Sequence, residues 1–290
     1  MKLLLKFNLI SIALVALGLV VVSLVARSFL LENARNQVLQ EAKLMMESAS
    51  STRKYTTEEL KPLLITSPLS KHEFLPQIVP AYGATVTFAR LRQKFPDYMY
   101  KEATLNPTNL QDRAVDWETD VVEAFRNKAD LKELVGERET ATGTSLYLAH
   151  PIVAEQSCLE CHSVPSVAPK VMIEKYGSAN GFGWKLNETI GAQVVSVPMS
   201  VPVAIANRAF SRLMWSLVGT FAIILLVVNL VLYFLVILPV RRLSTVADRV
   251  SLGQIEDAQL PVRGKDEMAQ LTASFNRLVV TVAKALRMLG

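Results

Sequence analysis

Two cysteines and one histidine lie together in residues 157–162, which read SCLECH. One helical turn separates the two thiols, so both can face the two vinyl groups of one porphyrin, with the adjacent imidazole below the iron. This spacing is typical of a c-type haem attachment site, in which Cys158 and Cys161 form thioethers and His162 is the proximal axial ligand. The chain contains only these two cysteines. One covalent haem would therefore leave no thiol for a disulfide.

Other interpretations use the same cysteines. A disulfide within the short loop suits a protein outside the cytosol. A thioredoxin-like redox pair needs no following histidine, and the flanking sequence lacks the βαβ pattern of that fold. A structural zinc site needs four ligands, and only His72, His150 and carboxylates are left to complete one. Covalent haem is therefore our main hypothesis, with the disulfide, the redox pair and zinc as alternatives.

Two uncharged apolar stretches contribute to a composition that is 51% hydrophobic. The first covers residues 7–26 and the second residues 213–240. Each has the roughly 20 residues that a helix needs to cross a bilayer core of about 30 Å. The first stretch follows Lys2 and Lys6 and resembles a signal peptide, but Leu24 and Ala26 make a poor cleavage site. We therefore expect an uncleaved spanning helix.

The distribution of basic residues predicts the topology. Lys2 and Lys6 precede the first stretch, and Arg241 and Arg242 follow the second, so the positive-inside rule places both termini in the cytoplasm. The protein is then expected to cross the bacterial inner (plasma) membrane twice, with the intervening domain in the periplasm, where c-type haem is attached. The predicted division is a cytoplasmic tail (1–6), spanning helices (7–26 and 213–238), a periplasmic domain (27–212) and a cytoplasmic domain (239–290).

The net charge of +5 is modest and spread along the chain. No basic run with interleaved aromatic residues is present, which argues against nucleic-acid binding. The arginines that follow the second stretch are explained by the membrane topology.

Mixed helix and strand patterns surround the haem motif and predict an α+β domain. A helical stalk continues from the first spanning stretch until Pro62, and a short helix is expected to carry the motif itself. The other expected elements are an interrupted helix (73–95), a helix (116–128), strands (98–104, 144–153 and 191–198) and a glycine-rich loop (176–184).

Residues 239–290 resemble a HAMP domain, a relay of bacterial receptors. The resemblance rests on Pro239, on Gly253 at the start of a connector and on Asp266-Glu267 at the start of a second helix. Two short helices with apolar stripes cannot bury them alone, so we expect a homodimeric four-helix coiled coil. The alternative is an amphipathic pair lying on the membrane. The stripe and connector residues are Leu243, Val246, Val250, Ile255, Leu260, Val262, Met268, Leu271, Phe275, Leu278, Val282, Ala285 and Leu289.

The periplasmic domain resembles a bacterial family of single-haem c sensor domains, formerly classed as a domain of unknown function, with cyanobacterial members. The shared segments are residues 101–107 (KEATLNP), 158–162 (CLECH), 176–177 (YG) and 180–184 (NGFGW). This resemblance covers about residues 35–200 and implies a PAS-like fold, a covalent haem and redox or ligand sensing. At least one member of that family uses cysteine as its distal ligand, which this chain cannot do because it has no third cysteine.

The distal axial ligand is open from the sequence. Met46, or its neighbour Met45, lies on the stalk where the family resemblance places the distal segment, and a thioether sulfur is an accepted haem ligand. Methionine at helical spacing is nevertheless more often core filling. His150, His72 and an iron site that is open or holds water are the alternatives.

The main functional hypothesis is a haem sensor of redox state or a small gas, which signals through its spanning helices and the HAMP domain. No kinase or cyclase segment follows the HAMP helices, so we expect no enzymatic output and a separate cytoplasmic partner, such as a histidine kinase. The alternatives are a membrane-anchored electron-transfer cytochrome, a small haem peroxidase using His150 or His72, and a receptor without haem.

Overall fold

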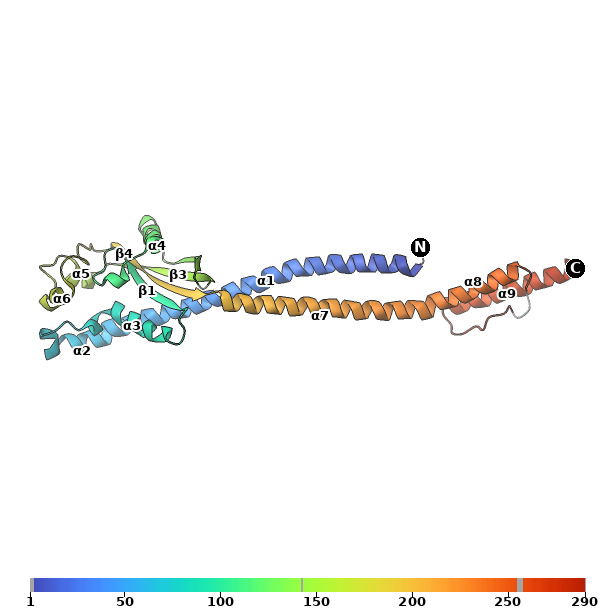
Figure 1. The fold of residues 1–290 in the computed structure, drawn as a ribbon, viewed down its shortest axis with the longest axis horizontal. Coiled ribbons are helices and arrows are strands. Elements are labelled where there is room, and N and C mark those ends of the chain that lie inside the picture. The colour runs from blue at the N-terminus through green and yellow to red at the C-terminus, as the bar shows by residue number, and fades with distance from the viewer. Residues whose placement is uncertain (1–2, 142, 255–257, 290) are drawn as a thin grey trace. The chain divides into compact units, whose positions relative to one another are not determined.

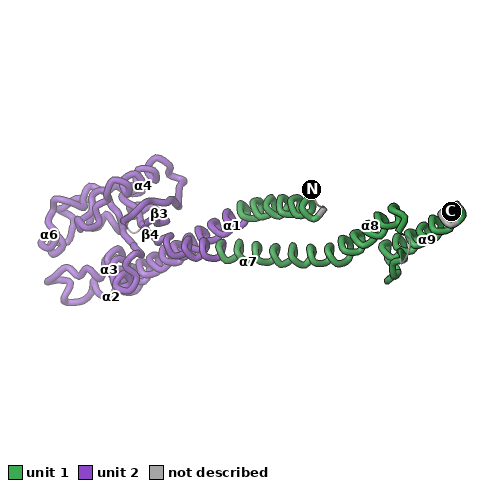
Figure 2. Tube along the Cα trace, turned by 45° about the vertical axis from the view of Figure 1, so that its right-hand side comes forward, with its two compact units in different colours: residues 1–25, 211–290 green, residues 26–210 purple. Residues whose placement is uncertain are grey.

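The computed structural model describes residues 3–141, 143–254 and 258–289 (Figure 1). The chain divides into two compact units, which Figure 2 shows in different colours. Residues 26–210 form the first, here called the sheet unit. Residues 1–25 and 211–290 form the second, here called the helical unit. Each unit is described by itself.

The predicted stalk is part of one helix, α1 (Leu3–Tyr55). In the sheet unit its buried residues recur every three or four positions, as an apolar helix face requires: Ala34, Val38, Ala42, Met46 and Ala49. Pro62 does not end the helix at once. A π-helical turn (Thr56–Leu60) precedes it, and α2 (Lys61–Ile65) contains it. Proline has no N–H and crowds the preceding turn, and a wider turn accommodates both effects.

Four antiparallel strands form one sheet in the order β1-β4-β3-β2. They are β1 (Met99–Thr104), β2 (Leu134–Thr140), β3 (Gly143–Val153) and β4 (Thr189–Pro198). The three predicted strands correspond to β1, β3 and β4, whereas β2 was not predicted. It is a half-exposed edge strand in which Glu137 and Glu139 face solvent. Charged residues protect such an edge from further pairing, and they also weaken the apolar signal of a strand.

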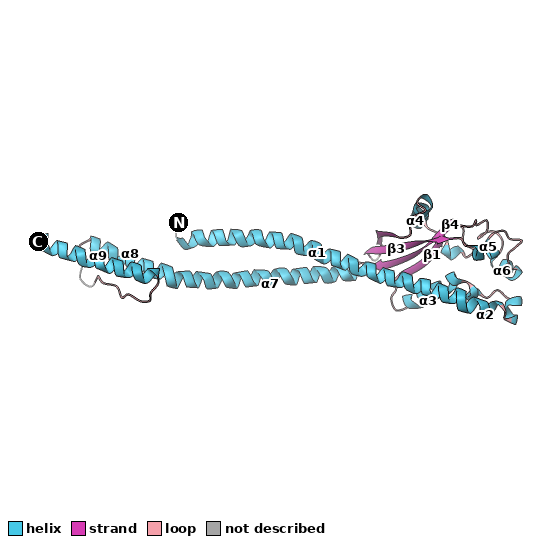
Figure 3. Cartoon of the chain, turned by 180° about the vertical axis from the view of Figure 1, so that it is seen from behind, coloured by secondary structure: helices cyan, strands magenta, loops and turns pink. Residues whose placement is uncertain are grey.

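Helices cover both faces of this sheet, as Figures 1 and 3 show. α1 and α3 (Pro80–Arg92) lie on one face, and α4 (Asp116–Asn127) lies on the other. In β4, Val195 and Val197 belong to the buried cluster that contains α1 residues, while Ala192 and Val194 belong to the cluster that contains α4 residues. Both faces of β4 are therefore apolar, because alternate side chains meet different helices. The α+β prediction is confirmed.

Short elements complete the sheet unit. The segment predicted as an interrupted helix contains a 3₁₀ turn (Pro76–Ile78) and then α3, which begins at Pro80 because proline is tolerated in a first helical turn. The motif lies on α5 (Gln156–His162), as predicted. α6 (Lys170–Tyr176) was not predicted; it has seven residues, too few for a clear helical period.

The helical unit contains the two apolar stretches. By length and composition, α1 and the helix that begins with α7 (Ser200–Leu232) are apolar enough to cross a membrane. A π-helical turn (Tyr233–Ile237) connects α7 to α8 (Leu238–Ser251), directly before Pro239. Proline thus follows a π turn at both of the chain's long helices, for the same reason as at Pro62.

The HAMP-like segment consists of α8, a connector and α9 (Glu267–Leu289). Gly253 has a φ of +84°, which opens the connector, and the Asp266 carboxylate accepts a hydrogen bond from the Ala269 N–H at 2.9 Å. That bond caps α9 where the sequence predicts its start. The predicted connector residue Ile255 lies outside the described residues. The cluster between the two helices contains Val246, Val250, Ala258, Phe275, Val279 and Val282.

Candidate functional site

The three predicted haem residues lie on α5, which follows β3 in the chain and precedes α6. Cys158 and Cys161 are both half-buried, and both are free thiols with no bond between them. The Cys158 N–H donates to the Glu155 carbonyl at 3.0 Å, which forms the first turn of the helix. One turn of helix therefore holds the two thiols and the imidazole of His162 in a fixed order.

The His162 ring is oriented by a backbone carbonyl. Its Nδ1 lies 2.7 Å from the Gly181 oxygen. A carbonyl only accepts hydrogen bonds, so Nδ1 carries the proton and Nε2 holds the lone pair. Among the residues that the structure describes, no hydrogen bond occupies Nε2. This is the arrangement of a neutral imidazole ready to ligate a metal through Nε2.

Gly181 is held in place by the segment that follows β1. Its φ of +82° favours glycine, and a Cβ atom there would lie 2.9 Å from both the Cα and N atoms of Thr108. The Asn106 side chain accepts from the Gly181 N–H at 3.1 Å and donates to the Phe182 carbonyl at 3.2 Å. Two of the segments that carry the family resemblance thus bind each other and aim the Gly181 carbonyl at the His162 ring.

Trp184 fixes the plane of the same ring. The two rings stack with centroids 4.0 Å apart and an interplanar angle of 13°. The backbone N–H of Trp184 donates to the His162 backbone carbonyl at 3.2 Å. Burial lowers the pKa of His162, and its hydrogen bond to Gly181 acts in the opposite direction. The neutral imidazole, which is the form that binds metals, is therefore favoured.

Two cations from the end of the stalk lie beside the thiols. Lys61 pairs with Glu160 at 3.6 Å, and its charge opposes the burial that raises the pKa of the Cys161 thiol. Arg53 forms a largely buried ion pair with Glu102, and it lies close enough to Cys158 to interact with it electrostatically. Arg53 was not predicted as a residue of the site. The pattern that could have identified it is a cation on the buried stripe of α1, seven residues after Met46.

Glu102 is the centre of a buried polar group on β1. The Tyr100 hydroxyl donates to Glu102 at 2.8 Å, and burial followed by the Glu102 charge raises the pKa of Tyr100. The pKa of Asp112 rises to about 6, first through burial and then through Glu102, while Lys101 opposes the rise. This group places negative charge near the end of the stalk that reaches the thiols.

The candidate distal ligands differ in their surroundings. Met46 is 2% exposed and belongs to the apolar cluster that α1 forms with the sheet, and Met45 packs against that cluster. Cys161 packs against a different cluster, built on Phe74, Ala168 and Met172. The His150 Nε2 lies 3.4 Å from a Glu133 carboxylate oxygen, and His72 follows a 3₁₀ turn (Pro68–Lys71). The structure thus groups Cys158, Cys161 and His162, and it places the two methionine candidates in or against a different apolar cluster from Cys161.

The donor set fits a c-type haem. Two free thiols and an imidazole with Nε2 available are the groups that such a haem uses. No group of three or more His, Cys, Asp and Glu side chains gathers to hold a metal ion within residues 3–141, 143–254 and 258–289. Within those residues the cysteine pair is not part of a group of the size that a zinc site needs.

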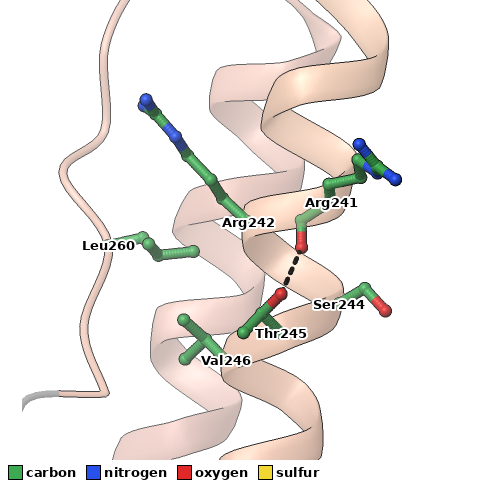
Figure 4. A pocket seen from close by; sticks show the side chains of 6 residues that line it. All are labelled: Arg241, Arg242, Ser244, Thr245, Val246 and Leu260. Atoms are coloured by element: carbon green, nitrogen blue, oxygen red, sulfur yellow. Dashed lines mark hydrogen bonds between the residues drawn. The ribbon is translucent and has the colours of Figure 1, made fainter.

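A hollow lies in the helical unit, beside α8 (Figure 4). Its lining contains two cations, but Arg241 and Arg242 point to opposite sides of α8 and do not converge on one ligand. The Thr245 hydroxyl is used within the helix, where it donates to the Arg241 carbonyl at 2.9 Å. The remaining lining residues are Ser244, Val246 and Leu260. This hollow lacks the chemistry of the α5 site.

Comparisons with protein-family models agree with the resemblances drawn from the sequence. A comparison with curated proteins finds no match. The crystal structure of the cyanobacterial heme-protein Tll0287 matches with 16% sequence identity and a TM-score of 0.44, over 55% of this chain and 94% of that chain. The HAMP domain model matches residues 232–283, and the Tll0287-like family model matches residues 31–198. Because this last match covers more than half of the 290 residues, the chain belongs to the Tll0287-like family.

Proposed function

We propose that this protein is a two-pass sensor of the bacterial inner membrane that binds one haem c covalently in its periplasmic domain. It signals redox state or a small gas through its spanning helices and HAMP domain to a separate cytoplasmic protein, such as a histidine kinase. The observation that carries the proposal is the His162 ring. Gly181 occupies its Nδ1, and its Nε2 remains available beside two free thiols.

Haem c, when bound, supplies a one-electron iron centre that also takes up small gases. Cys158 and Cys161 would attach its vinyl groups as thioethers, and His162 would bind the iron through Nε2. Gly181 and Trp184 keep the imidazole protonated at Nδ1 and fixed in plane. Arg53 and Lys61 present positive charge from the stalk next to the thiols, so a change of charge at the site acts directly on this segment.

The packing of the stalk on the last strand supports a route for the signal. Val195 and Val197 of β4 share one buried cluster with Val38 and Met46 of α1. α1 continues without interruption into the first apolar stretch, and β4 is followed after one residue by α7. A shift between α1 and β4 would therefore reach both spanning helices through the chain itself. Such a device requires two packing arrangements of similar free energy.

Met46 is the distal ligand that the sequence favours, and we retain it as a candidate for a direct test. Its place in an apolar cluster is equally suited to core filling. Met46→Leu conserves the volume of the side chain, so a core role predicts an unchanged haem spectrum and a stability loss below about 1.5 kcal/mol. A distal role predicts a lower reduction potential and a new spectrum, because the thioether ligand is lost.

The surface of α9 supports homodimerisation through the HAMP domain. Leu271 and Leu278 are 50% and 57% exposed, although they belong to the predicted apolar stripe. A second copy would cover them in the four-helix arrangement that HAMP sequences predict. The HAMP match also favours sensing over the alternative of a membrane-anchored electron-transfer cytochrome, which has no use for a relay.

The first test is an optical spectrum of the purified full chain as its reduced pyridine haemochrome, with and without carbon monoxide. We expect covalent haem in the parent chain and none in the Cys158→Ser/Cys161→Ser chain. Glu160→Gln, which changes the residue between the cysteines, is the matched control and should retain covalent haem. Rapid binding of carbon monoxide would indicate gas sensing, and no binding would indicate redox sensing. Absence of haem in cells with c-type maturation would refute the proposal.

The signalling step has a separate test. Trypsin digestion of oxidised and reduced membranes should give different cleavage patterns in α8 and α9 if the haem state reaches the HAMP domain. The Cys158→Ser/Cys161→Ser chain is the control and should give one pattern under both conditions. Identical patterns in the parent chain would leave the electron-transfer alternative.

A further inference from the structure

Each apolar stretch contains one carboxamide residue, and the two are bonded to each other. Asn8 is the only Asn or Gln in residues 7–26, and Asn229 is the only one in residues 213–238. The Asn8 Nδ2 donates to the Asn229 Oδ1 at 2.9 Å, and the Asn229 Nδ2 donates to the Asn8 Oδ1 at 2.8 Å. Both residues belong to the helical unit.

The remaining N–H of each amide is also used. The Asn8 Nδ2 donates to the Leu4 carbonyl at 3.0 Å, and the Asn229 Nδ2 donates to the Leu225 carbonyl at 2.8 Å. All four N–H groups of the two amides therefore have acceptors, and each side-chain oxygen accepts one bond. In hydrocarbon an amide without partners is costly, so this closed set strongly favours one alignment of the two helices.

The burial of residues near the pair agrees with this alignment of the two helices. Ser11, three residues after Asn8, and Leu225, four residues before Asn229, are both half-buried, whereas their neighbours Ile12 and Leu226 are 54% and 60% exposed. A slide by one turn, about 5.4 Å, would break both amide bonds between the helices. A rotation of either helix would do the same.

We propose that Asn8 and Asn229 form a polar clasp that fixes the register of the two spanning helices within one chain and holds the resting state of the sensor. The clasp rests on the proposed function only for its role in signalling. Its structural part stands independently, because the register of the helices does not depend on haem. A signal that slides α7 against α1 must open the clasp.

Disulfide formation between introduced cysteines tests the register in membranes that contain the full haem-loaded chain. The S11C/L225C chain keeps both asparagines and should form an internal disulfide that migrates as a monomer. The I12C/L226C chain, with exposed positions, should form little. Adding Asn8→Leu or Asn229→Leu should slow the internal disulfide of S11C/L225C by about threefold or more. Thr220→Leu, at an exposed polar position of the same stretch, should not change the rate.

The outcomes separate the clasp from the sensor. A dimer-sized product from S11C/L225C would show that the amides join two copies, and an unchanged rate in both Leu variants would show that they do not set the register; either result overturns the clasp. For its signalling role, Asn8→Leu should remove the difference between oxidised and reduced trypsin patterns, and a full difference would overturn that role. If the parent chain shows no such difference, the sensor proposal fails while the disulfide result still stands.

Discussion

The sheet unit and the HAMP segment solve the same packing problem in different ways. The sheet unit orders its site with its own residues: His162 receives a carbonyl from Gly181 and a stacked ring from Trp184. The HAMP segment buries only part of its apolar surface and leaves Leu271 and Leu278 exposed within one chain. A site ordered within one chain suits the stable binding of a group, whereas an incomplete interface suits a relay, because its packing depends on a partner and is open to change.

Among changes at the α5 site, substitution of Gly181 should destabilise the protein most. Gly181→Ala places a Cβ against the Thr108 backbone in a left-handed conformation, which we expect to cost about 3 kcal/mol. Gly177→Ala is the matched control, since Gly177 has a φ of +78° but open space around it, and it should cost less, about 2 kcal/mol. Denaturation of the detergent-solubilised full chain, followed by tryptophan fluorescence, measures both losses. Equal losses would show that Gly181 matters only for its backbone conformation.

The buried ion pair beside the site should give the next largest effect. Glu102→Gln leaves the Arg53 guanidinium without its charged partner, and we expect a loss of about 3 kcal/mol or somewhat less. Glu137→Gln removes an exposed pair with Arg35 and should cost below about 1 kcal/mol. The same denaturation experiment compares the two. If the two variants lose equal stability, the Glu102 pair does not behave as buried.

A charge introduced into the exposed apolar surface of α9 should weaken the HAMP dimer without unfolding the chain. Leu278→Glu should weaken the dimer by about 2 kcal/mol, or roughly 30-fold in its dissociation constant, because a leucine no longer enters the interface. Leu252→Glu alters another exposed leucine, 77% exposed and outside the predicted stripe, and should leave the dimer intact. Analytical ultracentrifugation in detergent measures both. A monomeric parent chain would contradict the predicted assembly.

The smallest effect should be a pH dependence confined to the sheet unit. The pKa of Asp112 is raised to about 6 in the folded chain, so between about pH 4 and pH 6 the folded state binds more protons than the unfolded state. Stability should therefore fall as the pH rises through this window. Asp112→Asn should remove that part of the fall, which we expect to be below about 1 kcal/mol because the group is partly exposed. If the stability of the parent and of the variant changed equally over this pH range, the raised pKa of Asp112 would be contradicted.

Local patterns in the sequence predicted the elements and the donors of the site. The CxxCH spacing identified Cys158, Cys161 and His162, and the structure places them together on one short helix. The stalk and both HAMP helices followed from apolar periodicity, because the side-chain direction repeats at a fixed interval in a helix. Three of the four strands followed from residue types that favour strands and from the turns that bound them. Glycine and proline signals located the loop around Gly181 and the start of α8 near Pro239.

Only the tertiary structure decided which distant residues meet. The Gly181 carbonyl that orients His162 lies 19 residues farther along the chain, and the Arg53–Glu102 pair joins residues 49 apart. The edge strand β2 and the cluster that encloses Met46 likewise depend on what packs against them. The sequence determines the chemistry of each side chain and, through the period of its helix or strand, the direction in which that side chain points. The partner of each group is set by how the folded chain brings remote segments together, and no local period encodes that choice.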